Sequence, residues 1–286
     1  MVVNLFFCIL AYIPVRIRDF LAEILSHCLF LIPKSFRRKV YTNLDYAFPD
    51  LEKDKKDNIY KNFVRIGLKV VLGYGVPFVR SKEYVKRSFK VTGQENLDKA
   101  VSKNRPILFV GSHCWTLDSS GIYLGSKYEK VVGLVHSTHN PVHNYCMNKM
   151  RLKFGGKVYE RKDGIKNIIK SLKDGYYFAF YPDLDLGPDG SLFVDFWGSK
   201  KATLTAVPRI VRLSDALVVP MTPTYNEKEH KIEITFYPHF ENYPTNDLEA
   251  DVIRVNKSIE AGLKGREEQY MWFLRIYRTR PENVEK

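Results

Sequence analysis

The residues best suited to chemistry are His113 and Asp118, five positions apart in the run ILFVGSHCWTLDSS. Residues 107–110 look like a buried strand, which places His113 at its C-terminal end. Asp118 falls in the first turn or so of the next helix. With His113 in the loop before that helix, Asp118 can accept a hydrogen bond from one ring nitrogen, and the other can take a proton from a substrate hydroxyl. Amides at the helix N-terminus would favour a developing oxyanion.

A covalent enzyme intermediate is not indicated. The GxSxG pattern of serine hydrolases is absent from the sequence. Cys114 adjoins His113, but in an extended segment neighbouring side chains point in opposite directions. We therefore expect direct attack by an activated hydroxyl.

A second cluster, YERKDGIKNIIKSLKDG, places Arg161 and Lys162 before an amphipathic stretch. The Arg161 guanidinium suits bidentate phosphate binding, and Lys162 adds a nearby positive charge. The alternative is a solvated helix start with no ligand.

A third cluster, YPDLDLGPDGS, follows an apolar strand, so Asp183 and Asp185 should lie near the same sheet edge as His113. One interpretation is a DxD pair that holds a divalent cation, as in glycosyltransferases. The other is a Gly-Pro turn ordered by its acids. The spacing of His136, His139 and His143 matches no zinc pattern, so we expect no metal site.

The formal net charge of +13 implies an anionic partner. Nucleic acid is a poor candidate, because the chain has no zinc-finger spacing, no aromatic RNA-binding motif and no basic region leading into heptads. The four cysteines form no CxxC pair and indicate free thiols in a reducing compartment.

The N-terminal region instead favours an anionic membrane surface. Residues 1–15 are uncharged but too short for a confident spanning helix. Apolar residues then recur at helical spacing, and a basic cluster follows in KSFRRK. The alternative is a helix that packs on the protein's own core. The predicted apolar stripe consists of Ile17, Phe20, Leu21, Ile24, Leu25, Cys28 and Leu31.

The remaining pattern predicts an α/β fold, with a mixed, largely parallel sheet flanked by helices. We expect an N-terminal helical membrane-associating region over 1–80 and a catalytic domain over 81–286. The predicted strands are 89–91, 107–111, 131–136, 177–181, 217–221 and 232–237. The predicted helices within the catalytic domain are 95–102, 116–125, 141–153, 163–173, 203–213, 249–264 and 267–277.

Several blocks in consecutive order resemble the lipid A late (secondary) acyltransferases of bacteria, with a lean towards the myristoyl-transferring branch. The blocks are NLDYAFP, HCWTLD, HNPVHNYCMNKMRLKFGG, ERKDGIK, PDLDLGP, FVDFWGSKKATL and EEQYMWFLRIYRTRP.

The resemblance implies transfer of a fatty acyl chain, myristoyl or lauroyl, from acyl carrier protein to a hydroxyl of a lipid A precursor. It implies His113 as general base with Asp118, and no cofactor. Arg161, Lys162, Asp183, Asp185 and Lys201 would contact substrate. The expected location is the cytoplasmic face of the bacterial inner membrane.

Two other functions fit the same motifs. A glycerolipid or glycolipid acyltransferase would keep the chemistry and change the acceptor. A non-catalytic lipid-binding protein would bind membranes without transferring a chain.

Overall fold

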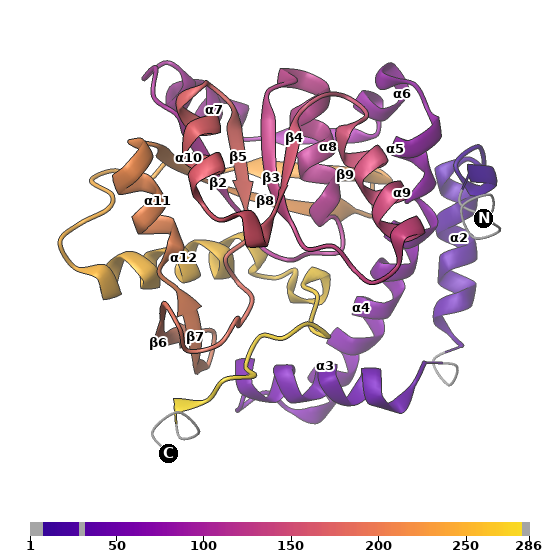
Figure 1. The fold of residues 1–286 in the computed structure, drawn as a ribbon. Helices are drawn as coiled ribbons and strands as arrows, with labels where there is room; N and C mark the ends of the chain where they lie inside the picture. The colour runs from indigo at the N-terminus through magenta and orange to yellow at the C-terminus, as the bar shows by residue number, and fades with distance from the viewer. Residues whose placement is uncertain (1–7, 29–31, 282–286) are drawn as a thin grey trace.

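The computed structural model describes residues 8–28 and 32–281, and its centre is a seven-stranded sheet with the order β1-β9-β8-β2-β5-β3-β4 (Figure 1). Every neighbouring pair runs parallel except β8 and β9. This confirms the predicted mixed, largely parallel sheet. The strands are β1 Phe89–Thr92, β2 Ile107–Val110, β3 Val131–Val135, β4 Lys157–Glu160, β5 Tyr177–Phe180, β8 Leu217–Asn226 and β9 Lys231–Phe236.

Helices cover both faces of the sheet (Figure 1). Alternate residues of β2 show this, because Leu108 and Val110 belong to one hydrophobic cluster while Ile107 and Phe109 belong to another. The helices are α2 Val15–Ser26, α3 Lys34–Ala47, α4 Lys53–Leu72, α5 Gly75–Val79, α6 Lys82–Arg87, α7 Gln94–Val101, α8 Leu117–Tyr128, α9 Pro141–Leu152, α10 Lys166–Lys173, α11 Ala206–Ser214 and α12 Leu248–Leu263.

The sequence pattern missed three strands and predicted one helix too many. The missed strands are β4 and the antiparallel hairpin of β6 Ser191–Phe196 and β7 Ser199–Leu204. The helix predicted over 267–277 is wrong, since only a 3-10 turn, Glu267–Gln269, forms there. This segment is rich in apolar residues because it crosses the core, where Tyr270, Trp272 and Ile276 are fully buried. The spacing of these residues was mistaken for that of a helix.

The predicted boundary near residue 80 falls between α5 and α6. Helices α3 and α4 contribute Val40, Leu44 and Phe63 to the same core cluster as the sheet residues Leu108 and Phe178. The division into two domains stays a prediction.

Helix α2 packs on the protein through its polar side, opposite to the usual arrangement of a surface helix. Its buried residues are Arg18, Asp19, Ala22 and Ser26. The predicted apolar stripe faces outward instead, with Phe20 65% exposed. The other exposed members are Ile17, Leu21, Ile24 and Leu25, while Leu31 lies outside the described residues.

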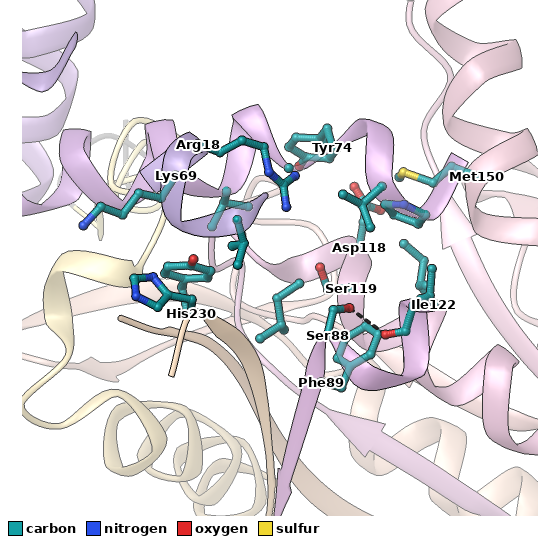
Figure 2. A pocket seen from close by; sticks show the side chains of 18 residues that line it. Arg18, Lys69, Tyr74, Ser88, Phe89, Asp118, Ser119, Ile122, Met150 and His230 are labelled. Carbon is teal, nitrogen blue, oxygen red and sulfur yellow. Dashed lines mark hydrogen bonds between the residues drawn. The ribbon is translucent and has the colours of Figure 1, made fainter. Parts of the chain in front are cut away.

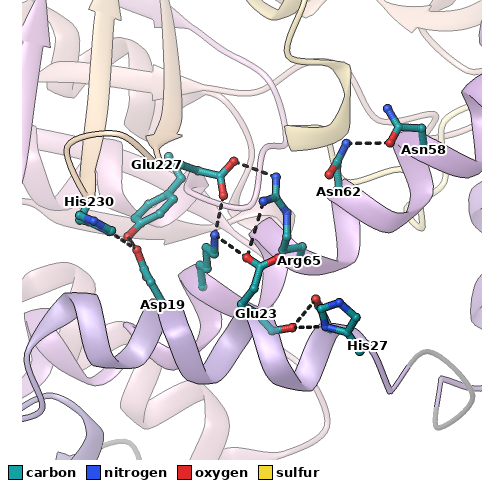
Figure 3. A network of polar contacts seen from close by, with 11 residues as sticks. Asp19, Glu23, His27, Asn58, Asn62, Arg65, Glu227 and His230 are labelled. Carbon is teal, nitrogen blue, oxygen red and sulfur yellow. Dashed lines mark hydrogen bonds and ion pairs between the residues drawn. The ribbon is translucent and has the colours of Figure 1, made fainter.

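A polar network holds α2 in this orientation (Figure 3). Asp19 accepts hydrogen bonds from the Tyr225 hydroxyl and from His230 Nδ1, both 2.6 Å long. One turn later, Glu23 pairs with Lys69 of α4 at 3.1 Å. These contacts join α2 to α4, to β8 and to the turn between β8 and β9, so the outward apolar face is a fixed feature of the fold.

By length and composition, one helix among the described residues, 53–79, could cross a membrane. However, 44% of its most apolar stretch is buried within the protein. Phe63 and Ile66 of this helix belong to the core, and a core helix passes the same test of length and composition.

Candidate active site

Two neighbouring parallel strands bring His113 and Asp183 together. In the register of β2 and β5, Val110 pairs with Phe180. His113 and Asp183 each follow three residues beyond these paired ends, so both lie at the same sheet edge. Gly111 continues the pairing by donating to the Phe180 carbonyl, and a side chain there would approach the Met221 carbonyl to 2.8 Å.

The Asp183 carboxylate contacts His113 twice. Oδ2 accepts the backbone N–H of His113 at 2.7 Å, and Oδ1 lies 2.6 Å from ring Nδ1. An ionised carboxylate only accepts hydrogen bonds, so Nδ1 carries the proton and the neutral ring has its lone pair on Nε2. The His113 side chain is 16% exposed, whereas Asp183 is fully buried. His113 is therefore a partly exposed imidazole bound to a buried carboxylate.

Charge and hydrogen bonding keep Asp183 ionised. Burial alone would raise the pKa of its carboxyl. The His113 ring charge and the two hydrogen bonds from His113 outweigh burial and hold that pKa below its usual value. At neutral pH, the carboxylate is thus available to stabilise an imidazolium.

The structure corrects the expected hydrogen bond between His113 and Asp118. Asp118 Oδ1 instead accepts from Arg151 Nε of α9 at 2.7 Å. Asp118 lies in the first turn of α8, while the ring nitrogen assigned to it is already bound by Asp183. Asp118 therefore orients a guanidinium, and Asp183 orients the imidazole.

His113 of the first pair and both members of the second pair line one groove of about 230 Å³ between α8, α9 and the strands β3 and β4. His113, Asp118 and Arg151 contribute polar atoms to it. Much of the remaining lining is backbone and aliphatic, including Gly133, Leu134, Val158 and Ala179. Such a groove can take an apolar chain with a reactive polar end.

The loop that carries His113 is held from two sides. Met271 N–H donates to the His113 carbonyl at 2.8 Å, and Cys114 forms an antiparallel bridge with Tyr270. On the other side, the Trp115 ring packs on α4 at Gly67, where an added Cβ would lie 2.5 Å from the ring. The C-terminal segment and α4 together fix the position of the His113 loop.

Cys114 is fully buried, and burial raises the pKa of its thiol to about 12. The thiol is thus protonated at neutral pH and is a poor nucleophile, as expected from its sequence position.

Arg161 and Lys162 form an exposed 3-10 turn directly after β4. They lie at the same sheet edge as His113, since β4 belongs to the parallel part of the sheet. Neither Arg161 nor Lys162 is among the described residues that line the His113 groove. Their position outside this groove leaves them accessible to an anionic headgroup.

Asp185 serves the structure of its loop. Its carboxylate accepts from Gly187 N at 3.0 Å and from both the backbone N–H and the hydroxyl of Thr279. It is 1% exposed. These contacts favour the interpretation in which an acid orders the Gly-Pro turn.

Lys201 is fully buried in β7 and donates to the Thr203 hydroxyl at 3.2 Å. Lys201 is not among the described residues that line the His113 groove, and its contact with substrate stays a prediction.

A smaller cavity of about 70 Å³ also has Asp118 in its lining (Figure 2). Its lining is mostly apolar, with Phe89, Ile122 and Met150, and the Arg18 guanidinium projects into it. Asp118 lines both spaces, so this residue separates the groove from the region beneath α2.

Arg151 is the site residue that sequence reasoning missed. It lies in the run HNPVHNYCMNKMRLKFGG, where no spacing rule links it to Asp118, 33 residues earlier. A basic residue in the last turn of an amphipathic helix is ordinary, so only the packing of α9 beside α8 reveals its role.

Comparison with known proteins places these features in context. A family model described as bacterial lipid A biosynthesis acyltransferase matches residues 1–279. A lipid A biosynthesis acyltransferase of Haemophilus influenzae is 31% identical over 277 residues, which cover 97% of this chain and 86% of the relative. The lipid A biosynthesis myristoyltransferase of Escherichia coli is 30% identical and covers 95% and 84%. The lauroyltransferase of the same organism is 30% identical and covers 86% and 80%.

Proposed function

Because the chain belongs to the bacterial lipid A biosynthesis acyltransferase family, we propose that it moves a myristoyl or lauroyl chain from acyl carrier protein to a hydroxyl of a lipid A precursor. The observation that carries this proposal is the hydrogen-bonded His113–Asp183 pair at the rim of a groove.

In the proposed reaction, Nε2 of His113 removes the proton from the acceptor hydroxyl as its oxygen attacks the thioester carbonyl. The carbonyl oxygen becomes negatively charged in the tetrahedral intermediate. When the intermediate collapses, the carbon–sulfur bond breaks, the ester remains, and the thiolate leaves to be protonated by the imidazolium. Asp183 stabilises that imidazolium between the two proton transfers.

Arg151 is placed to stabilise the oxyanion. Asp118 binds the guanidinium through Nε, which leaves its terminal nitrogens as the donors next to the groove. A cation held by a carboxylate is oriented before the charge develops, which is the condition for strong electrostatic stabilisation. Arg161 and Lys162, outside the groove, would receive a phosphate of the acceptor.

Replacing Arg151 with Ala should lower kcat by about 10²-fold with little change in KM, the usual cost of losing one oxyanion donor. Steady-state kinetics with an acyl-acyl carrier protein donor measures both constants. The matched control is Lys149→Ala, an exposed cation two residues earlier on α9. A higher KM at unchanged kcat would instead assign Arg151 to ground-state binding.

The acceptor is tested by direct competition. The purified protein is incubated with acyl-acyl carrier protein and an equimolar mixture of lipid A precursor and lysophosphatidate. The masses of the products are then measured by mass spectrometry. Addition of one acyl chain to the lipid A precursor supports the proposal. Acylation of lysophosphatidate alone would instead indicate a glycerolipid acyltransferase. Binding to vesicles without any acyl transfer would indicate a non-catalytic lipid-binding protein.

We also propose that the outward face of α2 enters the cytoplasmic leaflet of the inner membrane. This face is apolar, and the exposed basic residues Lys34, Arg37, Arg38 and Lys39 follow on α3. Basic residues next to an inserted apolar face add electrostatic attraction to anionic lipids. The attachment would bring the groove to the acceptor lipid.

The double substitution Phe20→Asp with Ile24→Asp should weaken binding to anionic vesicles at least tenfold, because burial of each side chain contributes about 1.5–3 kcal/mol. Vesicle flotation at several lipid concentrations measures the partitioning. Leu213→Asp is the control, since this side chain is 47% exposed on α11, far from α2 (Figure 1). Equal flotation of both variants would contradict membrane insertion through α2.

A further inference from the structure

The cavity of about 70 Å³ beneath α2 contains a cation that the proposed reaction does not use. Arg18 of α2 is 5% exposed, and its guanidinium points among the side chains that line the cavity (Figure 2). Its Nη1 donates to the Leu72 carbonyl over a long 3.5 Å, and its Nε is buried with no hydrogen-bond partner among the described residues. A guanidinium has five N–H donors and is always charged, so most of its binding capacity is unused.

Other charged groups in the lining already have partners of opposite charge. Lys69 pairs with two glutamates at 3.1 and 2.6 Å. The Asp118 carboxylate binds Arg151 at 2.7 Å. Arg18 takes part in none of the ion pairs within the part of the chain that the structure describes, although a buried charge is costly without such a partner.

Asp19, the next residue in the chain, is also bound elsewhere. Its Oδ2 accepts from the Tyr225 hydroxyl and from His230 Nδ1, both at 2.6 Å. Burial lowers the pKa of the Arg18 guanidinium despite the nearby charge of Asp19. The cavity therefore presents one positive charge whose compensation within the protein is incomplete.

The rest of the lining selects the kind of anion. Apolar side chains from α4, α8, α9, β1 and β9 face the cavity, and its volume is several times what a single water needs. An inorganic anion would lose its hydration against these walls and gain one cation. A phosphate monoester carries close to two negative charges near pH 7, which one guanidinium does not balance. A carboxylate on an aliphatic chain matches both the single charge and the walls. The apolar residues are Val70, Phe89, Ile122, Met150 and Ile232.

We propose that this cavity binds a free fatty acid, with its carboxylate on the Arg18 guanidinium and its methylene groups against the apolar walls. Val15 and Arg18 form the α2 side of the cavity, so the bound acid ties α2 to the rest of the protein. The site is separate from the proposed base, and the inference does not depend on acyl transfer.

Binding to the purified full-length protein tests the site, with decanoate as a soluble probe and isothermal titration calorimetry as the measurement. Decanoate should bind at least about tenfold more tightly than decan-1-ol, the lower limit for hydrogen bonds to a charged group. Acetate, which lacks the chain, should show no binding. Equal affinity for decanoate and decan-1-ol would overturn recognition of a carboxylate. Tighter binding of decyl phosphate than of decanoate would overturn it in favour of a lipid phosphate.

Arg18→Met locates the bound carboxylate, because Met keeps an apolar side chain without charge. We expect its affinity for decanoate to fall at least about tenfold, with affinity for decan-1-ol unchanged. Arg16→Met, an exposed cation on the same helix and outside the cavity lining, is the matched control and should bind decanoate like the wild type. Unchanged decanoate affinity in Arg18→Met would overturn the proposal, since the acid would then bind elsewhere, as in the His113 groove.

Thermal unfolding adds a readout that needs neither activity nor calorimetry. Saturating decanoate should raise the melting temperature of the wild type, because a ligand that binds only the folded state stabilises it. Without ligand, Arg18→Met should melt above the wild type, since it lacks the incompletely paired buried charge. No shift of the wild type with decanoate, or a ligand-free Arg18→Met that melts below the wild type, would contradict the site. If Arg18→Met did not fold, the wild-type comparison of decanoate with decan-1-ol would still decide.

Discussion

Replacing His113 with Ala should lower kcat by on the order of 10² to 10⁴, the usual contribution of a general base. The side chain removed is the partly exposed member of the pair, 16% exposed, at the rim of the groove. Substrate binding rests on other groups, so KM should stay close to the wild-type value. Turnover is measured with acyl-acyl carrier protein and lipid A precursor under saturating conditions.

The matched control for a general effect of losing a histidine is His239→Ala. His239 follows β9, which runs antiparallel to β8, so it lies at the opposite edge of the sheet from His113. His239→Ala should retain wild-type kcat. Equal activity of the wild type and His113→Ala would end the assignment of His113 as the base.

Replacing Asp183 with Asn should lower kcat by on the order of 10³ to 10⁴, as for an acid that orients a catalytic histidine. The Asn amide would donate to Nδ1 and force the ring proton onto Nε2, which is the nitrogen that must accept a proton. Asn keeps an acceptor for the backbone N–H of His113, now 2.7 Å from Asp183 Oδ2. A folded protein with a defective base is therefore expected.

The comparison with Asp118→Asn makes this prediction specific. The amide oxygen introduced by that substitution can still accept from Arg151 Nε, which lies 2.7 Å from Asp118 Oδ1 in the wild type. Only the charge of the contact is lost, so we expect kcat to fall roughly tenfold. Circular dichroism and melting temperature establish that both variants fold. A larger loss of kcat in Asp118→Asn than in Asp183→Asn would restore Asp118 as the residue that orients His113.

The sequence predicted where His113 lies but not which carboxylate binds its ring. An apolar run that ends in Gly111 and Ser112 placed His113 at a strand end, and the same reasoning put Asp183 at that edge. Choosing between Asp118 and Asp183 requires the strand order, because only the adjacency of β2 and β5 puts residues 113 and 183 side by side. Strand order depends on long-range pairing, which local periodicity does not encode.

Helix α2 shows a similar limit. Its amphipathic pattern was clear from the sequence, but the pattern does not say which face turns inward. The inward face is polar because Asp19 and Glu23 have partners on β8, on the turn between β8 and β9, and on α4, all distant in the chain. Lys201, in the block FVDFWGSKKATL, was expected to contact substrate, and only the packing of the hairpin shows that it is buried.

The protonation state of His113 tests the central claim most directly. Nitrogen-15 NMR of histidine-labelled protein distinguishes the two neutral tautomers, with the His113→Ala spectrum identifying the signals. At a pH where the ring is neutral, we predict a proton on Nδ1 and a lone pair on Nε2 in the wild type and in Asp118→Asn, and the reverse in Asp183→Asn. A wild-type ring protonated on Nε2, or a tautomer that changes with Asp118 and not with Asp183, would contradict the account.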